Sequence, residues 1–516
     1  MTLNRRDLTK ISAASAAGAF CTMPFGRAVF AQDATPAASG SGTLLVGKAE
    51  EAVGWDPAIV TATSSFELIA AVYETLLIFG DDGQPVGILA ESWEQPDDTT
   101  YVFRLREGVT FHNGQPLTAA DVKFSFERIM DPEGGSAWTS QLEPVESIEA
   151  TDDLTVTFTM KQPFGPFLAT LSGSSLAILP NLPDNDFQTS MIGTGAFMME
   201  SYTQDTETIL IANPNYWGDG EPKLAGITYR ILPEESARVA AVRTGEINLT
   251  SLVDPISIET LRTDAAVVVQ EQDTTDYYLL GLNCAVAPFD DVRVRQALSM
   301  AIDRQAILDG VFFGAGQVSG PVVPTMGDWA LPIEELPRYS VDVDGAKALL
   351  EEAGASDLSF SITVGADRTE FVNIALVIQD QLSQIGVTVE LDQVEWGTFI
   401  DKWIARDFQS FVSYNGSGND PDRALYPALI TDGSVNAFQF SDPAVDELLN
   451  QGRTQTTFDE RKATYDELQQ VVAEQAPMIF IGTRVGYFAT TPNVHGFAPT
   501  ASQTWRTLPQ VTVEEE

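Results

Sequence analysis

Apolar residues recur along the chain with two different periods, one typical of strands and the other of helices. Alternation of apolar and polar residues predicts half-buried strands at 101–106 and 155–160. Apolar residues at helical spacing predict helices at 66–77, 118–129 and 292–309. Because the two kinds of segment are intermixed from end to end, the pattern predicts an α/β protein.

The second half of the chain contains a segment with the order strand, helix, strand. The strands are predicted at 358–364 and 388–394, and the helix between them at 371–385, where Gly386 provides a C-terminal cap. This order is typical of a βαβ unit. No repeat of fixed period interrupts the mixture, so we expect large domains rather than an array.

Length and charge limit the class of protein further. The chain has 516 residues, with 29 basic and 73 acidic side chains and a formal net charge of −44. This length suffices for two or three domains with substantial cores. The charge repels nucleic acid and anionic lipid, so we expect neither as a partner. It also fits a high-salt habitat, in which screening relieves the self-repulsion.

The amino-terminal residues resemble an export signal. Arg5 and Arg6 precede the weakly apolar stretch 11–20, which is too short to anchor the chain in a bilayer. Together with a small residue at Ala31, this pattern predicts a twin-arginine signal peptide at 1–31, followed by a flexible tether at 32–42. We therefore expect an exported protein, periplasmic or associated with the cell surface.

Cysteine and histidine are scarce, which argues against several kinds of catalytic site. Cys284 is alone after the signal, and Cys21 follows the bulky Phe20, which disfavours lipidation. His112 and His495 are the only histidines, and neither accompanies a nucleophile elbow or a zinc motif. We expect no cofactor and no bound metal. A secreted hydrolase remains the alternative from another class, since acidic residues are too numerous for counting to decide against a glycosidase.

Several sequence blocks together resemble one known family. The blocks are Tyr73-Glu74-Thr75-Leu76, Leu89-Ala90-Glu91-Ser92-Trp93, residues 103–122, Gly193-Thr194-Gly195-Ala196-Phe197, Asn213-Pro214-Asn215-Tyr216-Trp217, and residues 290–304. In combination they resemble the family 5 extracellular solute-binding proteins of ABC importers, the group of the dipeptide- and oligopeptide-binding proteins. The similarity runs from about residue 43 to 500.

This resemblance implies a two-lobed fold of the type II periplasmic-binding-protein class, large and cluster C-like, with a hinge. The first lobe would comprise 43–275 and 484–516, with an inserted subdomain at about 86–190, and the second lobe 276–483. The family's proteins bind without catalysis, capturing a peptide or other polar solute in the cleft and delivering it to a membrane permease driven by a cytoplasmic ATPase. We expect a monomer; a role in feeding a sensor is an open alternative to transport.

One motif departs from the peptide-binding pattern. Peptide-binding relatives carry a pattern resembling Trp-x-x-Asp-x-x-Asp-Pro, whose first Asp holds the α-ammonium of the peptide. Alignment on Asp420 places Tyr414 at the Trp position and Ser417 at the anchoring Asp. A serine hydroxyl holds a buried ammonium far less well than a carboxylate does. The ligand class is therefore open between a peptide and a neutral glycoside or polyol. Asp420 would either order the Asp-Pro turn or face the cleft.

The remaining candidate ligand-binding residues are polar or aromatic side chains at positions that the resemblance places around the cleft. Aromatic rings that stack on a solute, with small polar groups that orient it, suit such a site. Trp396 has an alternative role as a core residue beneath the strand at 388–394. Besides Tyr414, Ser417 and Asp420, the candidates are Thr63, Ser64, Ser65, Tyr277, Asn283 and Trp396.

Overall fold

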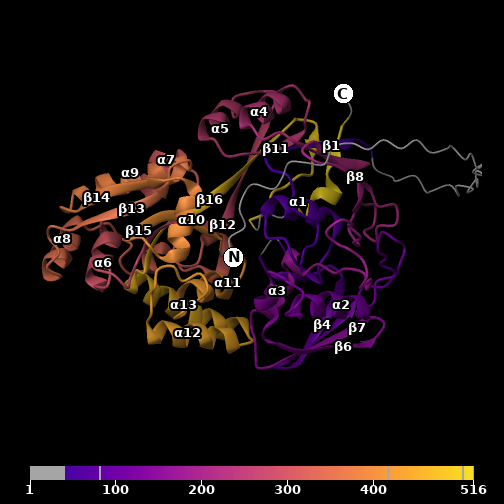
Figure 1. The fold of residues 1–516 in the computed structure, drawn as a ribbon, viewed down its shortest axis with the longest axis horizontal. Coiled ribbons are helices and arrows are strands. Elements are labelled where there is room, and N and C mark those ends of the chain that lie inside the picture. Colours follow the sequence, from indigo (N-terminus) through magenta and orange to yellow (C-terminus); the bar gives the residue numbers. More distant parts are fainter. Residues whose placement is uncertain (1–40, 81–82, 417, 502–504, 515–516) are drawn as a thin grey trace, which may run out of the picture. The chain divides into compact units, whose positions relative to one another are not determined.

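The computed structural model describes residues 41–80, 83–416, 418–501 and 505–514. Its largest sheet is mixed and has ten strands. The strands lie in the order β14-β13-β15-β12-β16-β11-β1-β10-β9-β8 (Figure 1). Their bounds are β1 Thr43–Lys48, β8 Phe197–Thr203, β9 Glu207–Ala212, β10 Gly226–Ile231, β11 Leu249–Leu252, β12 Val268–Leu282, β13 Ser359–Gly365, β14 Thr388–Val394, β15 Ser410–Gly416 and β16 Met478–Thr490.

Strands β12 and β16 form a long antiparallel pair that joins the two halves of this sheet. The ladder runs from Val268 opposite Thr490 to Gly281 opposite Met478. It is interrupted after Asp273, because the β12 segment 274–276 faces a single residue of β16 before pairing resumes. A bulge of this kind bends the strand and increases its local twist. Figure 1 shows both strands running from the half with β13–β15 to the half with β1 and β11.

A second, four-stranded antiparallel sheet has the order β4-β5-β7-β6. The predicted strands at 101–106 and 155–160 are confirmed as β5 and β7. Helix α2 covers this sheet, with Phe126 and Phe158 in edge-to-face contact at 5.1 Å between ring centroids. The bounds are β4 Ala90–Asp97, β5 Thr100–Leu105, β6 Val145–Asp152 and β7 Thr155–Met160; two small sheets pair β2 Leu77–Phe79 with β3 Pro85–Gly87 and β17 Val494–His495 with β18 Thr512–Val513.

The helices agree with most of the predicted ones. The bounds are α1 Thr63–Val72, α2 Ala119–Met130, α3 Phe167–Leu171, α4 Glu235–Arg243, α5 Pro255–Leu261, α6 Val292–Ala301, α7 Arg304–Phe312, α8 Val343–Glu352, α9 Thr369–Ser383, α10 Trp396–Ala405, α11 Pro421–Leu429, α12 Pro443–Thr454 and α13 Phe458–Gln475. The 3₁₀ segments are η1 Thr139–Leu142, η2 Ser174–Leu176, η3 Pro324–Trp329, which is kinked at Gly327, η4 Ile333–Glu335 and η5 Leu508–Gln510.

Two helix predictions were wrong, one because the helix is divided and one because it ends early. The helix predicted at 292–309 is divided into α6 and α7, because Ile302 is extended and the Asp303 carboxylate caps a new helix by accepting a hydrogen bond from the Ala306 amide at 3.0 Å. The helix predicted at 66–77 ends at Val72, because Tyr73 is extended and leads into β2.

Buried apolar side chains form separate clusters on the two sides of the β12 bulge. The clusters around β1, β10 and the four-stranded sheet contain residues from 44–269 and 487–513. The clusters around β13, β15 and α13 contain residues from 277–481. We call these groups the first and the second lobe, and the part of the first lobe around the four-stranded sheet the subdomain. The predicted boundaries at 275 and 484 lie in the stretches that belong to neither group.

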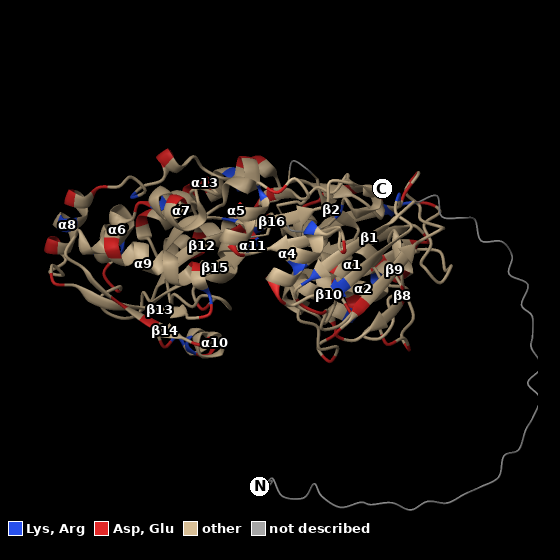
Figure 2. Ribbon diagram, turned by 90° about the horizontal axis from the view of Figure 1, so that it is seen from above, with Lys and Arg blue, Asp and Glu red and all other residues tan. Residues whose placement is uncertain are grey.

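Charged residues are spread over both lobes. Figure 2 shows Asp and Glu on elements throughout the described part, with fewer Lys and Arg between them. The negative charge is therefore distributed along the molecule. Among the described residues, no helix combines the length and the apolar character needed to cross a bilayer.

Candidate ligand-binding site

An arginine and two tyrosines meet where the β12–β16 ladder is interrupted. Arg484 of β16 forms an ion pair with Asp276 of β12 at 3.1 Å between Nη1 and Oδ2. Its guanidinium carbon lies 4.0 Å from the ring centroid of Tyr414 on β15 and 5.9 Å from that of Tyr278 on β12. Cation–π contacts of this kind hold a ring in place. Tyr414 keeps 41% of its surface exposed, so it presents an oriented aromatic face to solvent.

Trp396 lies in the same neighbourhood as Tyr414. It is the first residue of α10 and stacks on Phe399, with the ring centroids 4.9 Å apart and the planes 8° from parallel. Phe371 of α9 lies 6.1 Å from Trp396 and 6.2 Å from Tyr414 between ring centroids. The guanidinium of Arg368 lies 4.8 Å from the Trp396 ring. The structure therefore brings two of the predicted aromatic residues together around a third.

Asp420 performs the structural role that the Asp-Pro turn suggested. Its carboxylate accepts hydrogen bonds from both terminal nitrogens of Arg461, each at 2.8 Å, and caps α11 by accepting the Asp422 amide at 2.9 Å. Only 5% of the residue is exposed. These bonds occupy both carboxylate oxygens, so Asp420 reaches a solute only if this network rearranges. Ser417 lies outside the described residues.

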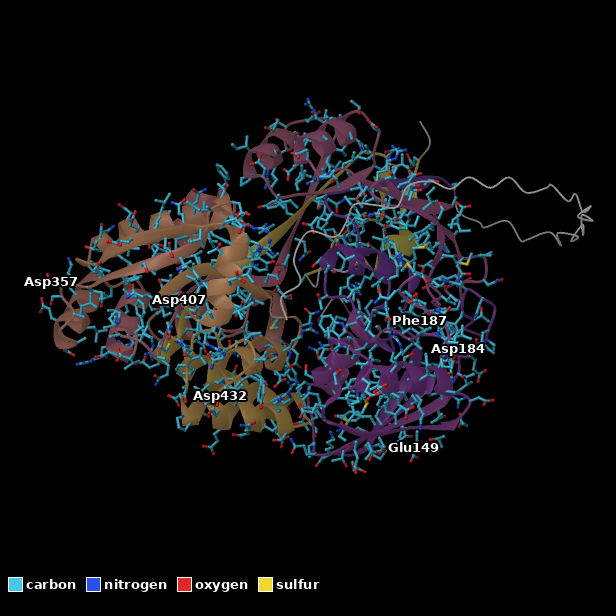
Figure 3. The ribbon with its side chains drawn as sticks, in the orientation of Figure 1. Glu149, Asp184, Phe187, Asp357, Asp407 and Asp432 are labelled. Carbon is cyan, nitrogen blue, oxygen red and sulfur yellow. The ribbon has the colours of Figure 1, made fainter. Side chains whose placement is uncertain are left out.

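Two other predicted residues of the second lobe are buried. Tyr277 has 1% of its surface exposed and packs on Phe480 at 5.1 Å between ring centroids. Asn283 is also 1% exposed, and its amide bonds the carbonyl of Phe408 at 3.1 Å. Asn283 lies on the wall of an open hollow of about 380 Å³, whose rim includes Asp407, labelled in Figure 3. This hollow belongs entirely to the second lobe and does not include Tyr414 or Trp396.

The three predicted residues of the first lobe begin α1. Thr63 is exposed and is the first residue of the helix. The Ser64 carbonyl accepts a hydrogen bond from the Lys48 ammonium at 2.6 Å, and the Ser65 hydroxyl accepts the Val53 amide at 3.0 Å. Among the described residues, no hydrogen bond joins this helix start to the second-lobe candidates. Thr63 is thus the member of this group with a side chain presented to solvent.

The blocks that carried the family resemblance build scaffold around a buried acid. Glu74 accepts hydrogen bonds from Thr194 at 2.8 Å and from Tyr216 and Trp217 at 2.9 Å each. Burial raises the pKa of Glu74 to about 7, although these three donors lower it. Because three separate blocks converge here, their function is to hold the first lobe together.

His112 is held by two backbone groups, and His495 lies at the surface. The ring nitrogens of His112 are within hydrogen-bonding distance of the Gly195 carbonyl, at 2.9 Å, and of the Gly193 amide, at 3.3 Å. Burial lowers the pKa of His112 to about 4, which keeps it neutral. His495 is exposed and lies beside Glu514. In the described ranges no group of three or more His, Cys, Asp or Glu side chains is arranged to hold a metal.

Sequence reasoning missed the arginines of the site. Arg484 and Arg368 orient the two aromatic residues, yet both stand in unremarkable sequence surroundings. The signal that could have located Arg484 is its place in the apolar strand 479–488, where a lone charge needs a partner. Helix α10, which carries Trp396, was also not predicted.

Two lobes with separate cores, joined by paired strands of one continuous mixed sheet, define a type II periplasmic-binding-protein fold. Residues 84–436 match the family model of the bacterial extracellular solute-binding proteins, family 5. The chain belongs to this family, whose members are binding components and not enzymes.

Similar proteins include several with different named ligands. Heme-binding protein A of Haemophilus influenzae is 30% identical over 89% of this chain and 90% of its own length. Di/tripeptide-binding protein 2 of Pseudomonas aeruginosa is 30% identical over 88% of this chain and 92% of its own length. The structure of AgaA in complex with agropinic acid, from A. tumefaciens R10, is 27% identical with a TM-score of 0.75, covering 92% of this chain and 99% of AgaA.

Proposed function

We propose that this protein is the extracytoplasmic substrate-binding component of an ABC importer. It captures a peptide or another polar solute between its lobes and delivers it to a membrane permease, whose ATPase supplies the energy. The arrangement of the lobes is the observation that carries this proposal. Their cores are separate, and the β12–β16 ladder that joins them is interrupted at 273–277. An interrupted ladder between two separately packed cores is suited to act as a hinge.

Closure follows from the solute's contacts. A solute that touches both lobes only when they are together favours that state by the difference in its affinity for the two states. We assign 43–275 with 484–516 to the first lobe, 86–190 to its inserted subdomain and 276–483 to the second lobe. The di- or tripeptide and the agropinic acid named for two of the similar proteins support a polar solute, whereas heme is named for a third.

The proposed site centres on Tyr414 and Trp396, whose rings would pack against the solute. Thr63 would contribute its hydroxyl from the first lobe, with the backbone of Ser64 and Ser65 behind it. Tyr277 and Asp420 would support the site from beneath, because they are buried within the second lobe. Asn283 would contribute only through the separate hollow that it lines beside Phe408. Ser417 completes the set as a polar contact in place of the charged anchor of peptide binders.

Export by the twin-arginine route is part of the same proposal. The signal at 1–31 and the tether up to residue 40 lie outside the described residues, whereas the last two tether residues are bonded to the first lobe, with the Ser41 amide donating to the Lys223 carbonyl at 3.0 Å. A fusion of residues 1–42 to a reporter that must fold before export tests the route. We expect export with the natural Arg5-Arg6 pair and none when both are replaced by lysine. Unimpaired export of the double-lysine fusion would contradict it.

Binding without chemistry is tested by combining thermal shift, scattering and product analysis. A solute at 100 times its Kd should stabilise the folded protein by about 2.7 kcal/mol. The same solute should reduce the radius of gyration in small-angle scattering and be recovered unchanged. Tyr414→Ala and Trp396→Ala should each weaken binding, whereas Tyr202→Ala, on the first-lobe strand β8, serves as a matched control. A screen without any stabilising solute, or recovery of a converted product, would contradict the proposal.

A further inference from the structure

Arg423 is a cation without a counterion in a strongly acidic chain. It is the third residue of α11, and the structure gives it no hydrogen bond or ion pair with any described residue. The nearby acids are already engaged. Asp420 holds Arg461 at 2.8 Å, and Asp422 holds Arg453 at 3.0 Å. Two carboxylates therefore meet three arginines, and Arg423 is the one left over.

The guanidinium of Arg423 lies between the two lobes. On the second-lobe side, a Cβ placed on Gly418 would lie 2.8 Å from its Cδ and 3.2 Å from its Nε. On the subdomain side, a Cβ placed on Gly173, in the turn between α3 and η2, would lie 3.7 Å from its Nη1. Two glycines thus leave the space in which this side chain extends from one lobe to the other.

The environment of Arg423 combines solvent exposure with closely packed protein. The side chain is exposed to solvent, yet the surrounding protein lowers the pKa of its guanidinium, and no neighbouring carboxylate offsets that effect. An exposed guanidinium without a counterion gains from an anion that enters from solvent. Peptide-binding relatives carry their amine-anchoring aspartate at the position of Ser417. The serine in this chain supplies no carboxylate there for Arg423.

A second unpartnered polar group points to the same place. Ser175 is 5% exposed, and the structure gives its hydroxyl no hydrogen-bond partner among the described residues. Its Oγ lies 3.7 Å from the Gly173 Cβ position, the same distance as the Arg423 Nη1. The Ser175 hydroxyl is therefore free to donate a hydrogen bond to an acceptor that enters from solvent. The two groups approach one point from opposite lobes.

We propose that Arg423 and Ser175 together bind a carboxylate of the solute at the meeting point of the two lobes. The proposal rests on the proposed function and specifies its substrate class, a solute with a free acidic group. An arginine binds a carboxylate through two parallel charge-assisted hydrogen bonds. The Ser175 hydroxyl donates a third from the subdomain. Because the donors belong to different lobes, the carboxylate gains all three only when the lobes are together, which couples recognition to closure.

Four related dipeptides distinguish recognition of the solute's carboxylate from recognition of its amine. They are Ala-Ala, N-acetyl-Ala-Ala, which keeps only the carboxylate, Ala-Ala amide, which keeps only the amine, and N-acetyl-Ala-Ala amide, which keeps neither. Their Kd values are measured by calorimetry for the wild type and for Arg423→Gln, Arg423→Lys and Ser175→Ala. Arg104→Gln is the control, because Arg104 carries the same charge on β5 and pairs with Glu107 at the surface.

The expected pattern is specific. The two probes with a carboxylate bind the wild type at least tenfold more tightly than their amides. Arg423→Gln removes that preference, Arg423→Lys restores part of it, Ser175→Ala weakens it and Arg104→Gln leaves it intact. Unchanged melting temperatures of the solute-free variants establish that they fold.

The alternative outcomes distinguish the two claims. If the amides bind tightly and Arg423→Gln does not change their affinity, the carboxylate anchor is wrong. The proposed function still stands in that case. If none of the four probes binds the wild type, and paired free acids and methyl esters of other polar solutes also leave its melting temperature unchanged, both the anchor and the proposed function are rejected.

Discussion

The subdomain touches the carboxyl-terminal end of α12 through Gly165, and this contact provides a direct test of lobe closure. The Gly165 amide donates a hydrogen bond to the Arg453 carbonyl at 2.8 Å, and the Phe164 ring lies 5.2 Å from the Arg453 guanidinium. A Cβ at position 165 would lie 2.0 Å from the Gln455 carbonyl oxygen and 2.8 Å from Cδ of Arg461. Because a backbone oxygen cannot move aside cheaply, Gly165→Ala must separate the two segments.

The size of the effect follows from the interactions that separation removes. One backbone hydrogen bond contributes about 1 kcal/mol. One partly exposed cation–π contact contributes about 0.5–1 kcal/mol. The loss of about 1.5–2 kcal/mol falls on the state in which the lobes touch, and it corresponds to a 10- to 30-fold weaker Kd for a solute that requires closure.

Calorimetric titration of Gly165→Ala with a solute identified by the thermal-shift screen measures this loss. Gly310→Ala is the matched control, because Gly310 lies in α7 and a Cβ there meets nothing within 4 Å. We expect the control to bind like the wild type. Equal affinity of Gly165→Ala and the wild type, with identical scattering curves in the presence of solute, would refute the reasoning.

Three further predictions concern the buried acids and the altered motif. Burial raises the pKa of Glu74 from its ordinary 4.5 to about 7, so its protonation stabilises the fold fully below about pH 4.5 and this contribution is lost as the pH rises through 7. The stability of the wild type relative to Glu74→Gln should therefore fall by about 2–3 kcal/mol between pH 5 and pH 8 in urea unfolding, and a flat difference would contradict the assignment. Arg461→Met should destabilise the protein by about 3–5 kcal/mol, because it leaves the Asp420 carboxylate buried without its partner; a change below 1 kcal/mol in the same assay would show that solvent reaches this acid. Ser417→Asp should tighten the binding of peptides with a free amine, and unchanged peptide titrations would count against the motif alignment.

Local signals in the sequence were sufficient for much of the fold. The Thr118 and Asp121 pair predicted the start of α2, and the structure shows the capping box, with the Thr118 amide bonded to Asp121 at 2.8 Å. Alternation predicted β5 and β7 because one face of each strand is buried. The break before α7 was missed because apolar spacing continues through it, although Asp303 carried a capping signal.

The candidate site was less accessible to such reasoning, because its geometry depends on contacts between distant segments. Arg484 is 70 residues from Tyr414 along the chain, and only the pairing of β15, β12 and β16 brings them together. Arg423 had no distinguishing pattern, since its isolation results from the pairing of Asp420 with Arg461 and of Asp422 with Arg453. Aromatic residues were easier to select, because Tyr414 aligned with a motif position.

The position of β16 within the ten-stranded sheet has a consequence for biosynthesis. This strand lies between β12 and β11, although it comes from residues 478–490 and is among the last segments to leave the ribosome. Both halves of the sheet must wait for it, so neither lobe has its full complement of strands until translation is nearly complete. Nascent chains that stall before residue 478 would expose the edges of β11 and β12, which are open templates for aggregation. A chain of this topology benefits from folding to completion before it is handed to a membrane machinery.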